Sequence, residues 1–309
     1  MKENQTTIKE SFTFSGKGLH TGKFVTTTVK PAVVNNGIKV VRVDCQPPVE
    51  VPVSATVVGD CARGTVLNLN GVQISTLEHL LAALHGLRVD NVTIETDGPE
   101  VPILDGSARY WAESILRVGI EKQSEERHYA RIEKPLHLDC GNGTIYDVIP
   151  SEDFQVECTI DFGNSVIGRQ TAWLTSYEQF ETEIAPCRTF VFLHELEPLL
   201  KANLIKGGDL ENAIVFVNKP LELEQQRRLA ELFNKDIEAF NVTKGVLNTS
   251  SLYFENEPAR HKLLDFMGDI LLVGAPLKGH FKIVCPGHKH NAEFSRLLQE
   301  NINLKKKEN

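Results

Sequence analysis

The order of strand-like and helix-like segments most constrains the fold of this chain, because the same order occurs in outline twice. In the first half, segments rich in Val, Thr and Phe precede a predicted helix at 75–87, where apolar residues recur at i, i+3, i+4 and i+7. In the second half, predicted strands extend to about residue 170 and are followed by helices and further strands. Runs of strands followed by helices are typical of α+β domains, so we expect two two-layer sandwiches of similar topology. The predicted strands are 7–14, 24–30, 37–43, 49–58, 91–96, 212–217 and 280–284, and the other predicted helices include 107–118 and 292–301.

A charged segment without periodicity, 119–129, separates the two halves and marks the expected domain boundary. A chain of 309 residues is long enough for two ordinary domains. A functional site built from residues of both domains would lie in the cleft between the domains, which is a favoured position for ligand pockets. We expect an N-terminal domain at 1–122, a linker at 123–130, a C-terminal domain at 131–304 and a basic tail at 305–309.

Composition and charge exclude several classes of protein. Hydrophobic residues make up 41% and charged residues 24%, which is typical of a globular protein and argues against disorder. The formal net charge of −8 argues against a nucleic-acid partner, since the only basic run, 305–307, lies in the tail. The first residues lack the apolar core of a signal peptide, and no apolar run approaches the ~20 residues that span a bilayer. We therefore expect a cytoplasmic protein without a transmembrane segment.

The six cysteines are spread along the chain without a Cys-x-x-Cys pair. A zinc site made of thiolates needs closely spaced cysteines, and a disulfide framework is typical of much shorter secreted chains. We expect neither, and predict reduced, mostly buried thiols. The cysteines are Cys45, Cys61, Cys140, Cys158, Cys187 and Cys285.

His261 and Asp265 form the pattern with the clearest chemical meaning. They lie four residues apart in a predicted helix that Pro258 opens, so the imidazole and the carboxylate point to the same helical face. Such a pair is half of a zinc site, and His79 and His288 are candidates for the rest. By spacing alone, a solvated i,i+4 pair is the commoner explanation.

Glu78 has a structural and a chemical interpretation. Ser75 and Glu78 match a capping box, in which the Glu hydrogen-bonds back to the helix cap. Alternatively, Glu78 adjoins His79 and serves as a general base beside a metal ion. An inverted zinc peptidase would need a His where Ser75 stands, and the His-Glu-x-x-His motif of other zinc peptidases is absent.

Eight segments, which run in family order and cover nearly the whole chain, resemble the zinc-dependent UDP-3-O-acyl-N-acetylglucosamine deacetylases of lipid A biosynthesis. No single motif is decisive, but eight in register are highly specific. The segments are 16–22 (GKGLHTG), 75–84 (STLEHLLAAL), 99–108 (PEVPILDGSA), 159–162 (TIDF), 187–190 (CRTF), 206–215 (KGGDLENAIV), 260–265 with 268–269 (RHKLLD, GD) and 287–288 (GH).

The resemblance implies a fold of two α+β sandwich domains with the active site between them. It also implies hydrolysis of the N-acetyl group of UDP-3-O-(3-hydroxyacyl)-N-acetylglucosamine, which releases acetate in an early committed step of lipopolysaccharide synthesis. One catalytic zinc ion would be held by His79, His261 and Asp265. A zinc-binding scaffold without turnover, and a deacetylase acting on another acetylated sugar or amine, remain alternatives. Glu78 and His288 argue against the scaffold, because a zinc site that only stabilises the fold needs neither a general base nor a general acid.

The resemblance assigns further roles residue by residue. The implied catalytic residues are Glu78 as general base, His288 as general acid or oxyanion partner, Asp269 as the residue that orients the His288 ring, and Thr189 as a hydrogen-bond donor to the oxyanion. The implied substrate-binding residues are Lys262 for the phosphates, Phe162 for the nucleotide end, and Phe190.

Two places in the chain, one single residue and one run of three, depart from the commonest family pattern. Val191 stands where many members have Gly, and Lys289, His290 and Asn291 follow His288, where small or apolar residues are usual. The segment 187–196 also resembles the members that are fused to a 3-hydroxyacyl-carrier-protein dehydratase. Such a fusion would continue beyond the basic tail, so this chain is interpreted as one half of a longer protein.

Overall fold

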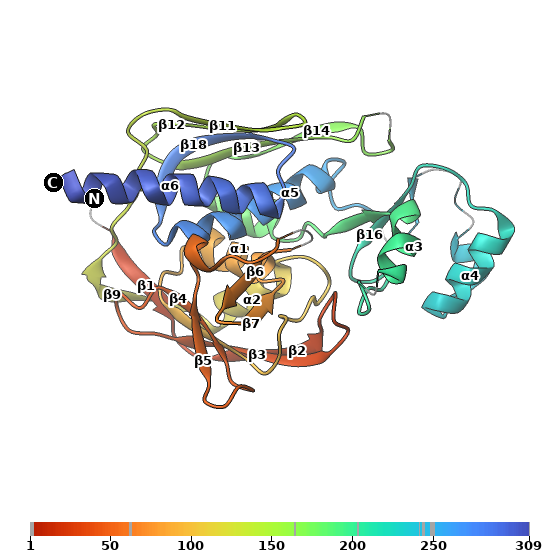
Figure 1. Ribbon diagram of the computed structural model, residues 1–309, viewed down its shortest axis with the longest axis horizontal. Helices are drawn as coiled ribbons and strands as arrows, with labels where there is room; N and C mark the ends of the chain where they lie inside the picture. The colour runs from red at the N-terminus through yellow and green to blue at the C-terminus, as the bar shows by residue number, and fades with distance from the viewer. Residues whose placement is uncertain are drawn as a thin grey trace.

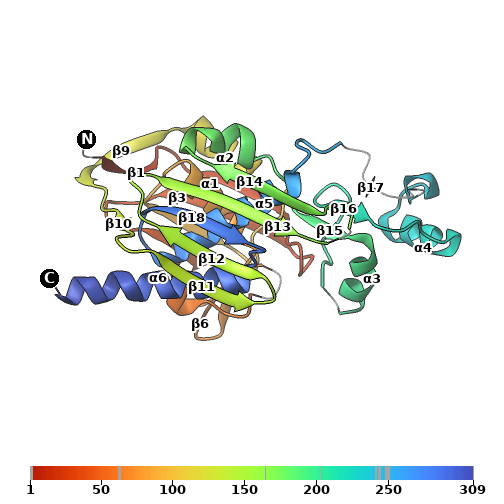
Figure 2. The same ribbon diagram turned by 90° about the horizontal axis from the view of Figure 1, so that it is seen from above.

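Two mixed sheets enclose a layer of helices in the computed structural model of the chain (Figures 1 and 2). Each half of the chain forms one sheet together with the helices on its inner face, so the predicted α+β architecture of two two-layer sandwiches is confirmed. The structure describes residues 3–61, 64–163, 165–202, 204–240, 242, 245–247 and 251–308.

The sheet of the first half has five strands, namely β2 (Phe12–Lys17), β3 (Phe24–Pro31), β4 (Ile38–Arg42), β5 (Val49–Pro52) and β8 (Val92–Thr96). Their order is β2-β3-β8-β4-β5, and the central strand β8 pairs antiparallel with β3 and parallel with β4. Val25, Thr27 and Val29 of β3 are buried and their neighbours less so, because successive side chains of a strand point to opposite faces.

The sheet of the second half has six strands, namely β10 (Ala130–Arg131), β11 (Leu136–Gly141), β12 (Thr144–Ile149), β13 (Phe154–Asp161), β14 (Arg169–Leu174) and β18 (Leu277–Val284). Their order is β11-β12-β18-β13-β14, with the short strand β10 beside β18. The central strand β18 pairs antiparallel with β12 and parallel with β13.

The two sheets have the same topology, as predicted. When β2-β3-β8-β4-β5 is matched with β11-β12-β18-β13-β14, each pairing has the same direction in both halves. Helix α1 (Glu78–Gly86) precedes β8 as α5 (Glu257–Asp269) precedes β18, and α2 (Arg109–Val118) follows β8 as α6 (His288–Glu308) follows β18. Helices α1 and α5 are therefore equivalent elements of the two halves.

Helices α1 and α5 pack directly against each other in the helix layer. All nine residues of α1 are buried, so the helix has no solvated face. A glycine permits the close approach, since a Cβ at Gly268 would lie 2.1 Å from the backbone oxygen of Glu78. This contact brings the first turn of α1 beside the last turn of α5.

Helix α1 begins three residues later than predicted. Ser75 is the last residue of strand β7 (Val72–Ser75), and Thr76 has a φ of +60°, which lies in the left-handed region. The residue before α1 makes no side-chain cap hydrogen bond. The capping-box interpretation of Ser75 and Glu78 is therefore wrong, because the chain turns sharply between them.

The charged segment between the halves contains a strand that its sequence pattern did not indicate. Strand β9 (Ile120–Glu126) pairs antiparallel with β1 (Asn4–Ile8), so part of the predicted linker 123–130 is a strand. Only three separate residues of β9 are partly buried, and none is fully buried. The strand is therefore stabilised by its backbone pairing with β1 and not by burial of an apolar face. At the other end, the predicted tail 305–309 belongs to α6 as far as Glu308.

A small subdomain projects from one end of the body (Figure 1). It has its own apolar cluster, which includes Leu193, Val215 and Phe240. Its elements are β15 (Phe190–Phe192), α3 (Leu193–Lys201), β16 (Ile214–Val217), α4 (Leu223–Phe233) and β17 (Gly245–Val246). A separate hairpin joins β6 (Val66–Leu69) to β7 and lies near the start of α1.

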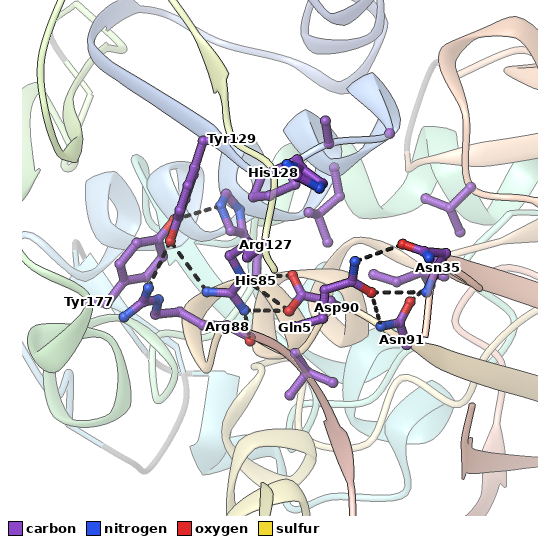
Figure 3. A pocket seen from close by; sticks show the side chains of 18 residues that line it. Gln5, Asn35, His85, Arg88, Asp90, Asn91, Arg127, His128, Tyr129 and Tyr177 are labelled. Carbon is purple, nitrogen blue, oxygen red and sulfur yellow. Dashed lines mark hydrogen bonds and ion pairs between the residues drawn. The ribbon is translucent and has the colours of Figure 1, made fainter. Parts of the chain in front are cut away.

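A polar pocket of about 330 Å³ lies at the C-terminal end of α1 (Figure 3). The guanidinium of Arg127 donates to both carboxylate oxygens of Asp90 at 2.7–3.0 Å. His85, in the last turn of α1, donates from Nδ1 to the backbone oxygen of Met267 at 2.7 Å and accepts from the hydroxyl of Tyr177 at 3.1 Å. These bonds fasten the two halves together at the end of α1 opposite Glu78.

All six cysteines are free, as predicted, although only Cys61, Cys158 and Cys187 are buried. Among the described residues, no helix combines the length and the apolar character needed to cross a membrane.

Replacement of Gly268 by Ala tests the close packing of α1 on α5. The added Cβ would collide with the backbone of Glu78, so we expect a loss of about 1–3 kcal/mol or more in the free energy of unfolding, as for other overpacked positions. Helix propensity alone predicts the opposite sign, a gain of about 1 kcal/mol. Urea denaturation measures the change. Gly16→Ala is the matched control, because its Cβ meets only Pro102 at 3.4 Å. A Gly268→Ala variant as stable as the wild-type chain would contradict the described packing.

Candidate metal centre and active site

A cavity of about 210 Å³ lies where the first turns of α1 and α6 meet α5. Both halves contribute to its wall, so it occupies the predicted cleft between them. The residues that line it are Leu19, Thr76, Glu78, His79, Ile103, Thr189, Phe190, His261, Lys262, Asp265, Gly287 and His288.

His79, His261 and Asp265 meet on one side of this cavity, and all three are buried. The Oδ1 atom of Asp265 is 3.3 Å from Nε2 of His261 and 3.7 Å from Nε2 of His79. In a tetrahedral zinc site with nitrogen and oxygen ligands at about 2.0–2.1 Å, neighbouring ligand atoms are about 3.3 Å apart. The three side chains are thus already close to the spacing of a metal-ligand set.

Asp265 carries the strongest sign that a cation belongs at this position. Its Oδ1 atom is buried and makes no hydrogen bond within the described part of the chain, and a buried polar atom without a partner is costly. Its other oxygen, Oδ2, accepts a hydrogen bond from Nζ of Lys262 at 2.8 Å. One carboxylate oxygen is therefore held by the protein and the other is free to bind a metal ion.

The protonation states also suit a metal ion. Burial, together with the nearby imidazole of His261, lowers the pKa of His79 to about 3, and burial lowers the pKa of His261 as well. Burial opposes ionisation of Asp265, but His261, Lys262 and His288 outweigh it and hold the pKa of this carboxyl well below its usual range. Two neutral imidazoles and one ionised carboxylate are the forms that coordinate divalent metals.

The tautomer of His261 is fixed by the backbone. Its Nδ1 donates to the carbonyl oxygen of Cys187 at 3.0 Å, which leaves Nε2 as the nitrogen with a free lone pair. Cys187 itself lies on the segment that leads into β15, so this bond also positions Thr189 and Phe190 at the cavity wall.

Glu78 faces the cavity as a buried carboxyl group and not as a helix cap. Its Oε2 accepts a hydrogen bond from the backbone N–H of Thr65 at 3.0 Å. Burial raises the pKa of Glu78 to about 7; the charge of His288 opposes this rise, whereas Asp269 and Asp265 add to it. A carboxyl group whose pKa lies near neutrality is suited to accept and return a proton.

His288, the first residue of α6, is held as a cation on another side of the cavity. Its Nδ1 donates to Oδ2 of Asp269 at 2.9 Å. Burial opposes protonation, but Asp269, Asp265 and Glu78 raise the pKa of His288 to about 9. Its Nε2 is 3.7 Å from Oδ2 of Asp265, so the ring lies next to the ligand set.

Asp269 is the centre of a hydrogen-bond network that sequence reasoning found only in part. Its carboxylate accepts from His288, from the hydroxyl of Thr65 and from the side-chain amide of Asn291 at 2.8 Å. The hydroxyl of Tyr146 donates to Asn291 in turn at 2.6 Å. Asn291 follows His288 by three residues on a helix, which is a signal that could have been used. Nothing in the sequence indicated Thr65, which comes from the β6–β7 hairpin region.

The residues predicted to bind substrate lie at different depths. Thr189, Phe190 and Lys262 line the cavity, and Nζ of Lys262 is 5.8 Å from the centre of the Phe190 ring. Phe162 does not line the cavity. It is 39% exposed and packs edge-on against Phe190 with ring centres 5.7 Å apart, so it lies at the outer side of the same wall.

An Asp269→Asn variant tests the electrostatic link to His288. Without the carboxylate, the pKa of His288 should fall from about 9 toward its ordinary value of 6.5 in the metal-free chain. The raised pKa of His288 stabilises the fold fully below pH 6.5, and this stabilisation is lost as the pH rises through about 9. Between pH 6.5 and 9 the free energy of unfolding should therefore fall less in the variant than in the wild-type chain. An NMR titration of the imidazole measures the shift. Asp147→Asn, which removes the exposed partner of His137, is the control and should leave His288 unchanged. An unaltered His288 pKa in Asp269→Asn would refute the link.

Comparison with known proteins gives one consistent result. The chain matches the family of UDP-3-O-acyl N-acetylglycosamine deacetylases over residues 5–235 and 238–300. It is 42% identical over 302 residues to the bifunctional enzyme LpxC/FabZ of Bacteroides thetaiotaomicron and 41% identical over 301 residues to that of Porphyromonas gingivalis. Both alignments cover 97% of this chain and 65% of the relative, so the chain spans slightly less than two thirds of these proteins. It is also 38% identical over 301 residues to the UDP-3-O-acyl-N-acetylglucosamine deacetylase of Nitratidesulfovibrio vulgaris, covering 97% of this chain and 89% of that protein.

Proposed function

The chain belongs to the family of UDP-3-O-acyl N-acetylglycosamine deacetylases, and we propose that it is a zinc-dependent amidohydrolase with the substrate of that family. The proposed reaction is hydrolysis of the N-acetyl group of UDP-3-O-(3-hydroxyacyl)-N-acetylglucosamine, which releases acetate in an early committed step of lipid A synthesis. One of the relatives carries the name of this deacetylase activity. The structural observation that carries the proposal is the buried Oδ1 of Asp265, which accepts no hydrogen bond within the described residues and lies beside the Nε2 atoms of two imidazoles whose pKa is lowered.

His79, His261 and Asp265 are the proposed ligands of one zinc ion. A set of three protein ligands with nitrogen and oxygen donors is typical of catalytic zinc sites, because it leaves a coordination position open. When bound, the ion supplies a Lewis acid that polarises the amide carbonyl and makes water easier to deprotonate. Among the ligands, the negative charge of Asp265 is kept in place by the ammonium of Lys262, which donates to the second carboxylate oxygen at 2.8 Å.

Glu78 is the proposed general base. An amide is a poor electrophile and water is a poor nucleophile, so removal of a proton from the attacking water is needed. Glu78 adjoins His79 in the first turn of α1, and its pKa of about 7 makes both proton uptake and proton return feasible near neutral pH. The Thr65 N–H donates to Oε2, and Oε1 is proposed as the oxygen that takes the proton from the substrate water.

His288 and Thr189 are the proposed partners of the negative charge that develops on the carbonyl oxygen. A protonated His288 stabilises this charge, and its Nε2–H is then a proton source for the leaving amine. The raised pKa of about 9 supports this role, because the ring carries the proton at neutral pH. Thr189 lines the same cavity, and its hydroxyl is proposed as a second donor. Asp269 acts as the residue that positions His288, through the 2.9 Å hydrogen bond to its Nδ1.

Lys262, Phe190 and Phe162 are proposed to bind the substrate. Lys262 combines a positive charge with a position at the cavity wall, which suits the phosphates of a nucleotide sugar. Phe190 provides an apolar surface beside it, and Phe162 extends that surface toward solvent, where the nucleotide end would lie. A shift of the Lys262 ammonium from Asp265 to phosphate becomes easier once a cation also neutralises Asp265.

The proposal also covers the cellular location of the reaction, the full-length protein and its domain boundaries. Nucleotide-activated sugars are made in the cytoplasm, so the proposed reaction takes place there. The longer bifunctional relatives support a full-length protein in which a dehydratase domain follows this chain. The matching topology of the two sheets supports two domains, at 1–122 and 131–304, with their junction in 123–130, the first part of which is strand β9.

The ligand assignment predicts that His79→Ala loses both bound zinc and acetate release. Elemental analysis of the purified, zinc-reconstituted variant gives the metal content, and circular dichroism establishes that it is folded. Lys262→Ala is the matched control from the same wall: it should keep the catalytic zinc while KM for the UDP-sugar rises. A folded His79→Ala variant with unchanged zinc content would show that the ligands are wrong, independently of which substrate is used.

The acid–base assignment predicts a bell-shaped pH dependence of kcat/KM. The rate should rise as Glu78 ionises, at or below about pH 7 because a bound cation favours the carboxylate, and fall as His288 loses its proton near pH 9. These limbs are macroscopic, since groups this close titrate together. Glu78→Gln should lower kcat roughly 100- to 10,000-fold and abolish the acidic limb while zinc is retained. Because Glu78 caps no helix, the substitution should leave the stability of α1 nearly unchanged. Near wild-type turnover in Glu78→Gln would exclude Glu78 as the base.

A further inference from the structure

A second group of metal-ligating side chains lies outside the cavity, on the outer part of the second half. It consists of Cys140 on β11 and of His290 and Glu293 on α6. One ligand atom of each residue, the thiol sulfur, an imidazole nitrogen and a carboxylate oxygen, lies within 4.8 Å of the others. We refer to these three residues as the β11–α6 cluster.

The fold brings the cluster together from two elements distant in sequence. Strand β11 is the edge strand of the six-stranded sheet, and the beginning of α6 lies beside that edge (Figures 1 and 2). Cys140 lies on the same, more buried face of β11 as Leu136 and Leu138, although the pairing with β12 shifts register between Asp139 and Gly141. His290 and Glu293 are three residues apart on α6 and therefore share one face of the helix.

The cluster lies at the margin of the main apolar core, against which Cys140 packs. All three side chains are partly buried. Within the described part of the chain, no hydrogen bond or ion pair engages the His290 ring or the Glu293 carboxylate. Burial, together with Glu293 and Asp139, raises the pKa of the Cys140 thiol in the metal-free chain, and exposed Lys289 opposes this rise. Lys289 makes no ion pair with Glu293 in the described structure.

The combination of donors selects a particular class of metal. A thiolate and an imidazole favour zinc and similar ions over Mg²⁺ and Ca²⁺, which prefer oxygen ligands. In a tetrahedral zinc site with these donors, neighbouring ligand atoms lie about 3.3–3.6 Å apart. Closing the cluster to that size requires movements of about 1 Å, which side-chain torsions at a partly solvated position can supply. Solvent would provide the fourth ligand.

We propose that Cys140, His290 and Glu293 bind a second thiophilic divalent cation, Zn²⁺ or a close analogue, which fastens the start of α6 to the edge of the sheet. On binding, the Cys140 thiol releases its proton to solvent and the thiolate coordinates the ion. The two positive charges of the ion then balance the thiolate and the Glu293 carboxylate. The site is separate from the candidate catalytic centre, which contains two imidazoles and a carboxylate but no thiolate.

The position of the cluster gives it a consequence for the candidate active site. His290 is two residues from His288, and Asn291, which holds Asp269, lies between His290 and Glu293. A metal ion that ties His290 and Glu293 to β11 would restrain the same helical turn that presents His288. The role of the bound ion is thus structural: it cross-links α6 to β11 beside the candidate active site. Its loss should increase the mobility of the N-terminal turn of α6.

Cobalt substitution tests the proposal directly. A thiolate bound to Co²⁺ produces a charge-transfer absorption band in the near ultraviolet, whereas coordination by His79, His261 and Asp265 alone produces none. The metal-free wild-type chain titrated with Co²⁺ should therefore bind two equivalents and develop this band, and added Zn²⁺ should remove it. His79→Ala should keep the band while one equivalent is lost, which separates this site from the proposed catalytic one.

Variants of the cluster complete the experiment. Cys140→Ser should abolish the band and lower the metal content from two equivalents to one, and His290→Gln should do the same. Cys45→Ser, which alters a partly exposed cysteine outside the cluster, is the matched control and should retain both. A wild-type chain that binds only one equivalent without the band would overturn the proposal. So would a band that persists in Cys140→Ser, because another thiol would then be the ligand.

Discussion

The candidate active site depends on the packing of α1 against α5. These helices occupy equivalent places in the two halves, and neither carries a complete ligand set by itself: His79 comes from α1, and His261 and Asp265 come from α5. Gly268 lets the backbones approach closely enough for Glu78 and His79 to face Asp265. The interface between the halves is therefore part of the proposed metal centre as well as of the fold, and any change in the separation of the two helices alters the spacing of the three candidate ligands.

Three buried carboxyl groups lie around this interface, and their surroundings give them different properties. Asp265 is surrounded by imidazoles and the Lys262 ammonium, so its pKa is lowered and it remains an anion. Burial dominates at Glu78 and raises its pKa to about 7. Asp269 faces His288, whose pKa it helps to raise to about 9. The separated pKa values of Asp265 and Glu78 suit the proposed roles of metal ligand and general base, and the hydrogen bond from His288 suits Asp269 as the residue that positions it.

Much of the fold could be predicted from local periodicity, whereas the candidate site was implied by the family resemblance, since the spacing of His261 and Asp265 alone favours a solvated pair. The i,i+4 spacing of His261 and Asp265 places them on one helical face wherever that helix lies. The predictions of a capping box at Ser75 and of a linker at 123–130 failed because backbone pairing with other segments determines both structures. Ser75 ends strand β7 and so does not cap α1, and β9 forms because β1 pairs with it. Thr65 and the β11–α6 cluster could not be foreseen, because they depend on a hairpin and a sheet edge that fold against helices far along the chain.

Acetate release by a metal-depleted and then reconstituted chain tests the central claim most directly. The chain is treated with a chelator, dialysed, and incubated with UDP-3-O-(3-hydroxyacyl)-N-acetylglucosamine before and after zinc is restored. We expect no acetate from the depleted chain and steady release after zinc is added. Release that is unaffected by metal depletion, or a zinc-loaded and folded chain that releases none, would contradict a zinc-dependent deacetylase built on His79, His261 and Asp265.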